Sequence, residues 1–135
     1  MVTTKIEYCG GLRSKAVHGP SGTAIDLDAP ADIGGGGTTF SPTDLVGAAL
    51  GGCILTTMAM VAQRRGIELA GAQAEVVKHM TSDKPRRIAC FDVAIRLSGE
   101  VPGDVRALLA RAARLCPVHA SLAPEVTVNL TFQYD

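Results

Sequence analysis

Residues 41–53 read SPTDLVGAALGGC, and no further charged side chain appears until Arg64. Ser41 can accept hydrogen bonds from the first free backbone N–H groups of a helix. Pro42 suits the first helical position because it has no N–H to leave unpaired, and Asp44 can bond back to the cap and oppose the helix dipole. These residues predict that a long helix begins at Pro42.

The uncharged segment 45–62 is long enough to raise the question of a transmembrane span. It is rich in Gly and Ala rather than Leu and Ile, and it ends in the basic turn 64–66 with glycine as the stop signal. We therefore predict a core helix that is buried on nearly all sides. The small residues Gly47, Gly51 and Gly52 would bring another backbone close, and a symmetry-related copy could supply part of the cover.

Alternating apolar and polar residues predict strands on both sides of this helix. A second, amphipathic helix begins at Pro102, and Cys116-Pro117 interrupts it and can begin a further short turn. The predicted class is α+β, with the order βββ-α-ββ-α-β in a single domain over residues 1–135. The predicted strands lie at about 3–8, 12–17, 25–29, within 67–80, within 86–97 and at 125–134.

The composition excludes several classes of protein. Thirteen Lys+Arg balance thirteen Asp+Glu, so there is no electrostatic footprint for nucleic acid or an anionic membrane. Zero net charge and a mean hydropathy of +0.22 favour a homo-oligomer that hides apolar surface. The N-terminal residues show no secretory signal, so we expect a cytoplasmic protein. The glycine run 34–37 is a loop, and it lacks the Lys-Ser/Thr of a phosphate-binding loop.

The four cysteines do not form a metal or disulfide framework, because they are scattered and no C-x-x-C occurs. Cys9 and Cys90 lie on the non-core faces of their predicted strands, and we interpret both as structural. The histidines are spread along the chain, and Cys116-x-x-His119 is only half of a metal motif, so neither a metal nor a cofactor is expected. In a reducing compartment, the remaining thiols are either inert or chemically active.

Cys53 and Cys116 can each be interpreted as an inert thiol or as a chemically active one. Cys53 lies deep inside the predicted helix, too far from its start for the dipole to favour a thiolate, so it could be an inert core residue. Cys116 lies at a proline-initiated turn, where free N–H groups favour a thiolate, and a second nearby thiol is what a redox cycle requires. The spacing in the sequence leaves open whether the two thiols meet.

Residues 40–53, taken together with the segment LCPVHASL at 115–122, resemble the OsmC/Ohr family of organic hydroperoxide reductases, in particular its less characterised OsmC-like branch. The stretch GGLR at 10–13 and the glycine loop are similar to that family as well. The resemblance implies an intertwined homodimer, in which antiparallel sheets wrap a pair of central helices and the active sites lie at the subunit interface.

The resemblance also assigns roles to single residues. Cys53 would attack the peroxide, and Cys116 would close a disulfide that a dithiol reductant of lipoyl or thioredoxin type reopens. Arg13 would match the family's arginine, paired with Asp44, and a buried thiolate needs such a permanent cation. Other members carry Glu near the helix start, whereas this chain has the shorter Asp44 behind Thr43.

The function implied is a thiol-dependent peroxidase that reduces organic hydroperoxides and, less efficiently, hydrogen peroxide. The alternative is a non-catalytic dimer that binds a small apolar or thiol-reactive ligand at its interface, with Cys53 only lining the site. Aromatic residues are scarce, so a pocket would be lined by aliphatic side chains and methionines. Met58 and Met60 are candidates, although filling the core is the commoner role of such methionines.

Overall fold

The computed structural model describes all residues from Met1 to Asp135. Its elements follow the predicted order, and the predicted turn after Cys116 is a short third helix. The elements are β1 (Thr4–Gly10), β2 (Arg13–His18), β3 (Ala24–Asp28), the 3-10 turn η1 (Ala31–Ile33), α1 (Pro42–Gln63), β4 (Gln73–Met80), β5 (Ile88–Leu97), α2 (Gly103–Arg114), α3 (Pro117–Ser121) and β6 (Thr127–Tyr134). The chain divides into two compact units, Met1–Val46 and Gly47–Asp135.

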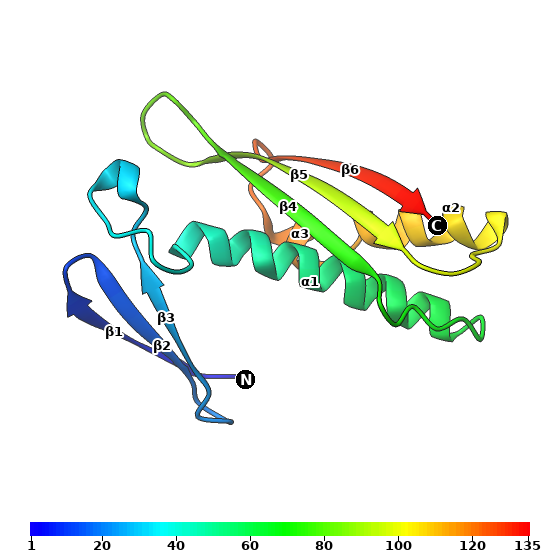
Figure 1. Cartoon of the computed structure of the whole chain (residues 1–135), viewed down its shortest axis with the longest axis horizontal. Coiled ribbons are helices and arrows are strands. Elements are labelled where there is room, and N and C mark those ends of the chain that lie inside the picture. Colours follow the sequence, from blue (N-terminus) through cyan, green and yellow to red (C-terminus); the bar gives the residue numbers. More distant parts are fainter. The chain divides into compact units, whose positions relative to one another are not determined.

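The first unit is built on an antiparallel sheet in the order β1-β2-β3 (Figure 1). One cross-strand row joins Ile6, Ala16 and Ile25, and successive residues of a strand point to opposite faces. Ile6 and Tyr8, on this apolar face, keep 66% and 68% of their surface exposed. The other face carries charged residues. The apolar side is covered at Ala16 and Leu27 but stays exposed at Ile6 and Tyr8.

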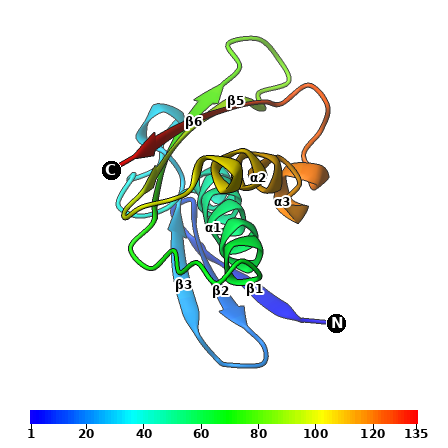
Figure 2. The same ribbon diagram turned by 90° about the vertical axis from the view of Figure 1, so that its right-hand side faces the viewer.

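The second unit is built on the sheet β4-β5-β6. β4 and β5 form the predicted antiparallel hairpin, but β5 and β6 run parallel. The expectation of wholly antiparallel sheets is therefore wrong at this pair. The reason is the connection, because α2 and α3 carry the chain back across the sheet, and such a crossover sets up parallel strands. Figures 1 and 2 show α1 and α2 on the same face of this sheet.

The core of the second unit lies between that face and the helices. Alternate residues of β5 point inward and are almost completely buried, as are residues of α1 and α2. Gly47 and Gly51 allow the sheet to approach α1, since a Cβ on them would lie 3.1 Å from Phe91 and 3.0 Å from Val76. The fully buried apolar residues include Leu50, Ile54, Met58, Phe91, Ile95, Leu97 and Leu109.

The opposite side of α1 is not covered by the second unit. Gly52 has no atom within 4 Å of the position that a Cβ would take, and Met60 is 53% exposed. The expectation of burial on nearly all sides is therefore not met within the single chain. By length and composition α1 could cross a membrane, and 33% of its apolar window is buried inside the structure.

Candidate functional site

Cys53 lies near the middle of α1, on the border between the buried and the exposed side of the helix. Its side chain is partly accessible, in contrast to the fully buried Leu50 and Ile54 that precede and follow it. Its backbone carbonyl accepts a hydrogen bond from Oγ1 of Thr57 at 2.8 Å. A small molecule can therefore reach the Cys53 thiol while α1 stays packed in the core.

Cys116 is completely buried and caps the N-terminus of α3. Its extended backbone, with φ −65° and ψ 144°, is typical of an N-cap residue, and Pro117 occupies the first helical position. The backbone N–H of His119 donates to Sγ of Cys116 at 3.3 Å. Nδ1 of His119 is itself buried without a hydrogen-bond partner. The capping position holds the Cys116 sulfur in a fixed orientation.

The structure brings the Cys53 and Cys116 thiols together, which the sequence spacing alone had left open. Burial is the largest cause that raises the pKa of Cys116 above its ordinary value, and the His119 N–H acts in the opposite direction. A side-chain hydrogen bond with Cys53 and the charge of a Cys53 thiolate raise the pKa of Cys116 further. Both cysteines are reduced. Cys116 is therefore a neutral thiol that can donate a hydrogen bond to the Cys53 sulfur.

Arg13 is exposed at the first position of β2. Its cross-strand partner on β3 is Asp28, which is 2% exposed. The Asp28 carboxylate accepts hydrogen bonds from the backbone N–H of Gly36 and from the backbone and side chain of Thr38. The glycine loop thus binds an anion, but this anion is a carboxylate of the same chain. Asp28 could not be identified from the pattern of residues in the sequence.

Asp44 forms the predicted helix cap with Ser41. Oδ2 of Asp44 accepts from the backbone N–H of Ser41 at 2.8 Å, and the backbone N–H of Asp44 donates to Oγ of Ser41 at 3.1 Å. This reciprocal pair is a capping box, and it fixes the start of α1. Of the two candidate methionines, Met58 is buried in the core and Met60 is exposed.

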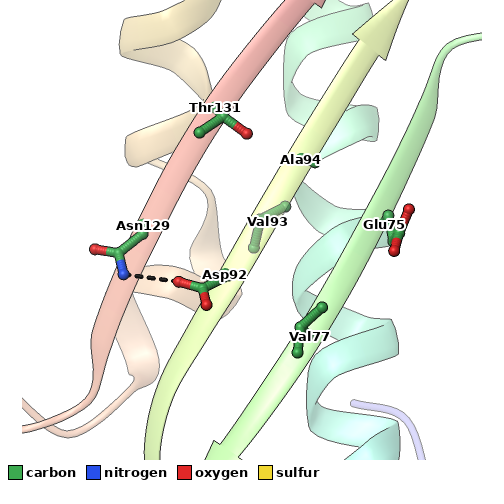
Figure 3. A pocket seen from close by; sticks show the side chains of 7 residues that line it. All are labelled: Glu75, Val77, Asp92, Val93, Ala94, Asn129 and Thr131. Carbon is green, nitrogen blue, oxygen red and sulfur yellow. Dashed lines mark hydrogen bonds between the residues drawn. The ribbon is translucent and has the colours of Figure 1, made fainter.

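A shallow hollow of about 240 Å³ lies on the outer face of the second sheet (Figure 3). Glu75, Asp92 and Asn129 contribute polar groups to its lining, and neither Cys53 nor Cys116 does. Asp92 accepts from Asn129 at 2.8 Å and lies 2.7 Å from Nε2 of His79. The hydrogen bonds from Asn129 and His79 hold the pKa of Asp92 below its usual range. This second polar cluster was also missed by the sequence analysis.

Cys90 belongs to the same outer cluster, and Cys9 lies exposed on β1. The prediction that Cys90 lies away from the core face of β5 is confirmed, since the adjacent Phe91 is buried. β1 has no buried residue, so it does not test the same prediction for Cys9. The residues of the chain include no group of three or more His, Cys, Asp or Glu side chains arranged to hold a metal ion.

Comparisons with known proteins agree with this architecture. A candidate osmotic stress induced and detoxification response protein from Psychrobacter arcticus is 36% identical, with a TM-score of 0.93 over 98% of this chain and 96% of that one. The OsmC organic hydroperoxide resistance protein from Legionella pneumophila is 23% identical, with a TM-score of 0.77 over 98% and 96% of the two chains.

A third similar structure, from Vibrio cholerae, is described as an organic hydroperoxide resistance protein with captopril bound in one of its active sites. It is 17% identical, with a TM-score of 0.75 over 96% of this chain and 90% of that one, and so shares the fold. No curated protein matches the sequence. The family described as OsmC-like protein matches residues 34–131, which include both thiols and the start of α1. This chain therefore belongs to the OsmC-like protein family.

Proposed function

We propose that this protein is a thiol-dependent peroxidase that reduces organic hydroperoxides and, less efficiently, hydrogen peroxide. The observation that carries the proposal is the contact between a partly accessible Cys53 and a buried, neutral Cys116. A thiolate is the nucleophile in such reactions, and a nearby second thiol converts the oxidised sulfur into a disulfide before it is oxidised further.

The proposed cycle has three steps. The Cys53 thiolate attacks the distal peroxide oxygen, the O–O bond breaks, and the alkoxide leaves with a proton as the alcohol while Cys53 becomes a sulfenic acid. The Cys116 sulfur then attacks the Cys53 sulfur, and water leaves as the disulfide forms. A dithiol of lipoyl or thioredoxin type then reduces this disulfide by thiol–disulfide exchange. The dithiol is oxidised to its own disulfide, and Cys53 and Cys116 become thiols again.

The proposed cation is Arg13, with Asp44 as its proposed partner. An arginine stays charged under all physiological conditions, so it can stabilise a thiolate and the negative charge that grows on the leaving oxygen. Asp44 is shorter by one methylene than the glutamate usual in the family, and it already accepts from the Ser41 cap. An interaction of Arg13 with Asp44 would therefore need a closer approach than a glutamate requires.

We further propose that the working protein is a cytoplasmic homodimer and that residues 1–135 act as one domain within it. The exposed apolar residues support a second copy as the partner. They include Ile6, Tyr8 and Ile25 on the first sheet and Met60 on α1, and a second copy could cover such exposed apolar side chains.

The test is hydroperoxide consumption with dithiothreitol as the dithiol, in the wild type and in three variants. Cys53→Ser should lose essentially all consumption of cumene hydroperoxide. Cys116→Ser should retain a first turnover and accumulate a Cys53 sulfenic acid that dimedone traps. Cys9→Ser is the matched control and should behave as the wild type. Consumption by Cys53→Ser at the wild-type rate would rule out the peroxidase and favour the ligand-binding alternative.

A further inference from the structure

We propose that Asp28 is the residue that positions Arg13 in the reaction. The inference rests on the role proposed above for Arg13. It adds a carboxylate that the resemblance to known peroxidases did not supply, and every observation behind it lies within the first unit, Met1–Val46.

The first observation is the register of the sheet. Arg13 on β2 is paired directly with Asp28 on β3. Side chains of directly paired residues project from the same face, with their Cβ atoms about 5 Å apart. Arg13 lies at the end of its strand, just after the irregular turn where Gly10 pairs with Arg13 and Leu12 adopts a positive φ of 61°. The Arg13 guanidinium is therefore attached to the irregular end of β2, where a neighbouring charge can fix the direction of the side chain.

The second observation is that the Asp28 carboxylate cannot turn away. It accepts from the Gly36 N–H at 3.2 Å, from the Thr38 N–H at 3.1 Å and from Oγ1 of Thr38 at 2.7 Å. A Cβ on Gly36 would lie 2.7 Å from Oδ2 of Asp28, which real contacts do not reach, so glycine is required where the loop closes around the carboxylate. Asp28 is thus a fixed negative charge, and its mobile neighbour is the longer Arg13.

The third observation is electrostatic. The side-chain hydrogen bond from Thr38 is the largest cause that lowers the pKa of Asp28, followed by the Thr38 backbone N–H, while burial acts in the opposite direction. The Gly36 N–H and the positive charge of Arg13 lower this pKa as well. Asp28 is consequently ionised at physiological pH, and the attraction between the two charges is mutual.

The same face of the sheet supplies a natural control pair. Lys15 and Asp26 are directly paired two positions further along the same strands. Asp26 is exposed, whereas Asp28 is buried and held by the loop. Substitutions at Lys15 and Asp26 therefore change charge on the same strands and face without touching the fixed carboxylate.

The first test does not depend on activity. The titration of the Asp28 carboxyl carbon is followed by NMR in the wild type, in Arg13→Met and in Lys15→Met. We expect Arg13→Met to move the Asp28 titration to higher pH and Lys15→Met to move it much less. Equal shifts in the two variants, or none in Arg13→Met, would show that Arg13 is not held by Asp28.

The second test measures kcat/KM for cumene hydroperoxide in Asp28→Asn and Asp26→Asn. Asp28→Asn keeps one oxygen that accepts from the loop but loses the charge and the second accepting oxygen. Because a small misplacement of a catalytic group can cost about 100-fold, we expect a loss of about 10-fold to 100-fold, mainly in kcat, and no loss in Asp26→Asn. Thr38→Val keeps the Asp28 charge but loosens it, and should give a smaller loss.

A double substitution separates positioning from a purely structural role. Adding Asp28→Asn to Arg13→Met should cause no further loss of kcat/KM, because the residue to be positioned is already gone. A full additional loss in the double variant, or an Asp28→Asn protein as active as Asp26→Asn, would overturn the inference. A wild type that does not consume hydroperoxide would instead overturn the proposed function, while the NMR result would still decide the Arg13–Asp28 pairing.

Discussion

At the residue scale, the surroundings of Cys90 disfavour the thiolate form of its side chain. Its S–H donates to Oδ1 of Asp92 at 3.7 Å. Burial is the largest cause that raises the pKa of Cys90, and the charge of Asp92 and its hydrogen bond raise it further. Since the thiolate is the reactive form, we expect Asp92 to slow the oxidation and alkylation of Cys90.

Replacing Asp92 by Asn removes the negative charge and leaves an oxygen that can still accept a hydrogen bond. We expect Asp92→Asn to speed the alkylation of Cys90 by iodoacetamide at pH 8 several-fold, because a larger fraction of this thiol ionises. Peptide mass spectrometry measures the rate, and the exposed Cys9 of the same molecule is the internal control. An unchanged Cys90 rate would contradict the protective role of Asp92.

The sequence analysis named the two thiols but missed both fixed carboxylates, and the difference is physical. Cys53 and Cys116 lie in motifs that are contiguous in the chain, so the resemblance to a known family could name them. Asp28 is defined by N–H groups eight and ten residues away, and Asp92 by Asn129, 37 residues away. Hydrophobic alternation predicts on which face of its strand each carboxylate lies, but it does not predict which distant groups donate hydrogen bonds to that carboxylate.

At the scale of elements, local patterns in the sequence were sufficient to predict the order of the helices and strands. The capping box of Ser41 and Asp44 placed the start of α1 at Pro42, where the structure has it. The pairing of β5 with β6 was not predictable in the same way. Hydrophobic alternation identifies the face of a strand, but its neighbour and its direction depend on the path of the intervening helices.

Gly51 tests how closely α1 and β4 approach each other. A Cβ on Gly51 would lie 3.0 Å from Cγ2 of Val76, whose branched side chain has little freedom to move. Gly51→Ala should therefore lower the free energy of unfolding by about 1 kcal/mol, because overpacking costs about 1–3 kcal/mol and exceeds the gain of about 1 kcal/mol in helix propensity. Urea denaturation measures the change.

The matched control is Gly103→Ala at the start of α2, where a Cβ would meet no atom within 4 Å. Its effect on the free energy of unfolding should stay within about 0.5 kcal/mol, as for an ordinary surface substitution. A Gly51→Ala protein as stable as the wild type would show that the contact between α1 and β4 is looser than the structure indicates.

At the scale of the whole molecule, the proposed homodimer can be tested through Ile6, which is 66% exposed in the single chain. Because so little of Ile6 is buried, Ile6→Asp should leave the fold intact but place a charge in the proposed interface. Analytical ultracentrifugation should give twice the chain mass of 14.0 kDa for the wild type and mostly monomer for Ile6→Asp.

Lys5→Asp, on the opposite face of β1, is the control and should remain dimeric. A wild type that sediments as a monomer would overturn the proposed homodimer. An Ile6→Asp protein that is as dimeric as Lys5→Asp would mean that the apolar face of the first sheet is not where the second copy packs. The exposed side of α1 would then be the remaining candidate for the interface.

The most direct test of the proposed chemistry is a count of free thiols after a single exposure to hydroperoxide. The reduced chain has four cysteines, and one equivalent of cumene hydroperoxide should lower the count of titratable thiols to two. Peptide mapping should then find one disulfide, between Cys53 and Cys116. A count that stays at four, or a disulfide that forms between other cysteines, would contradict the account.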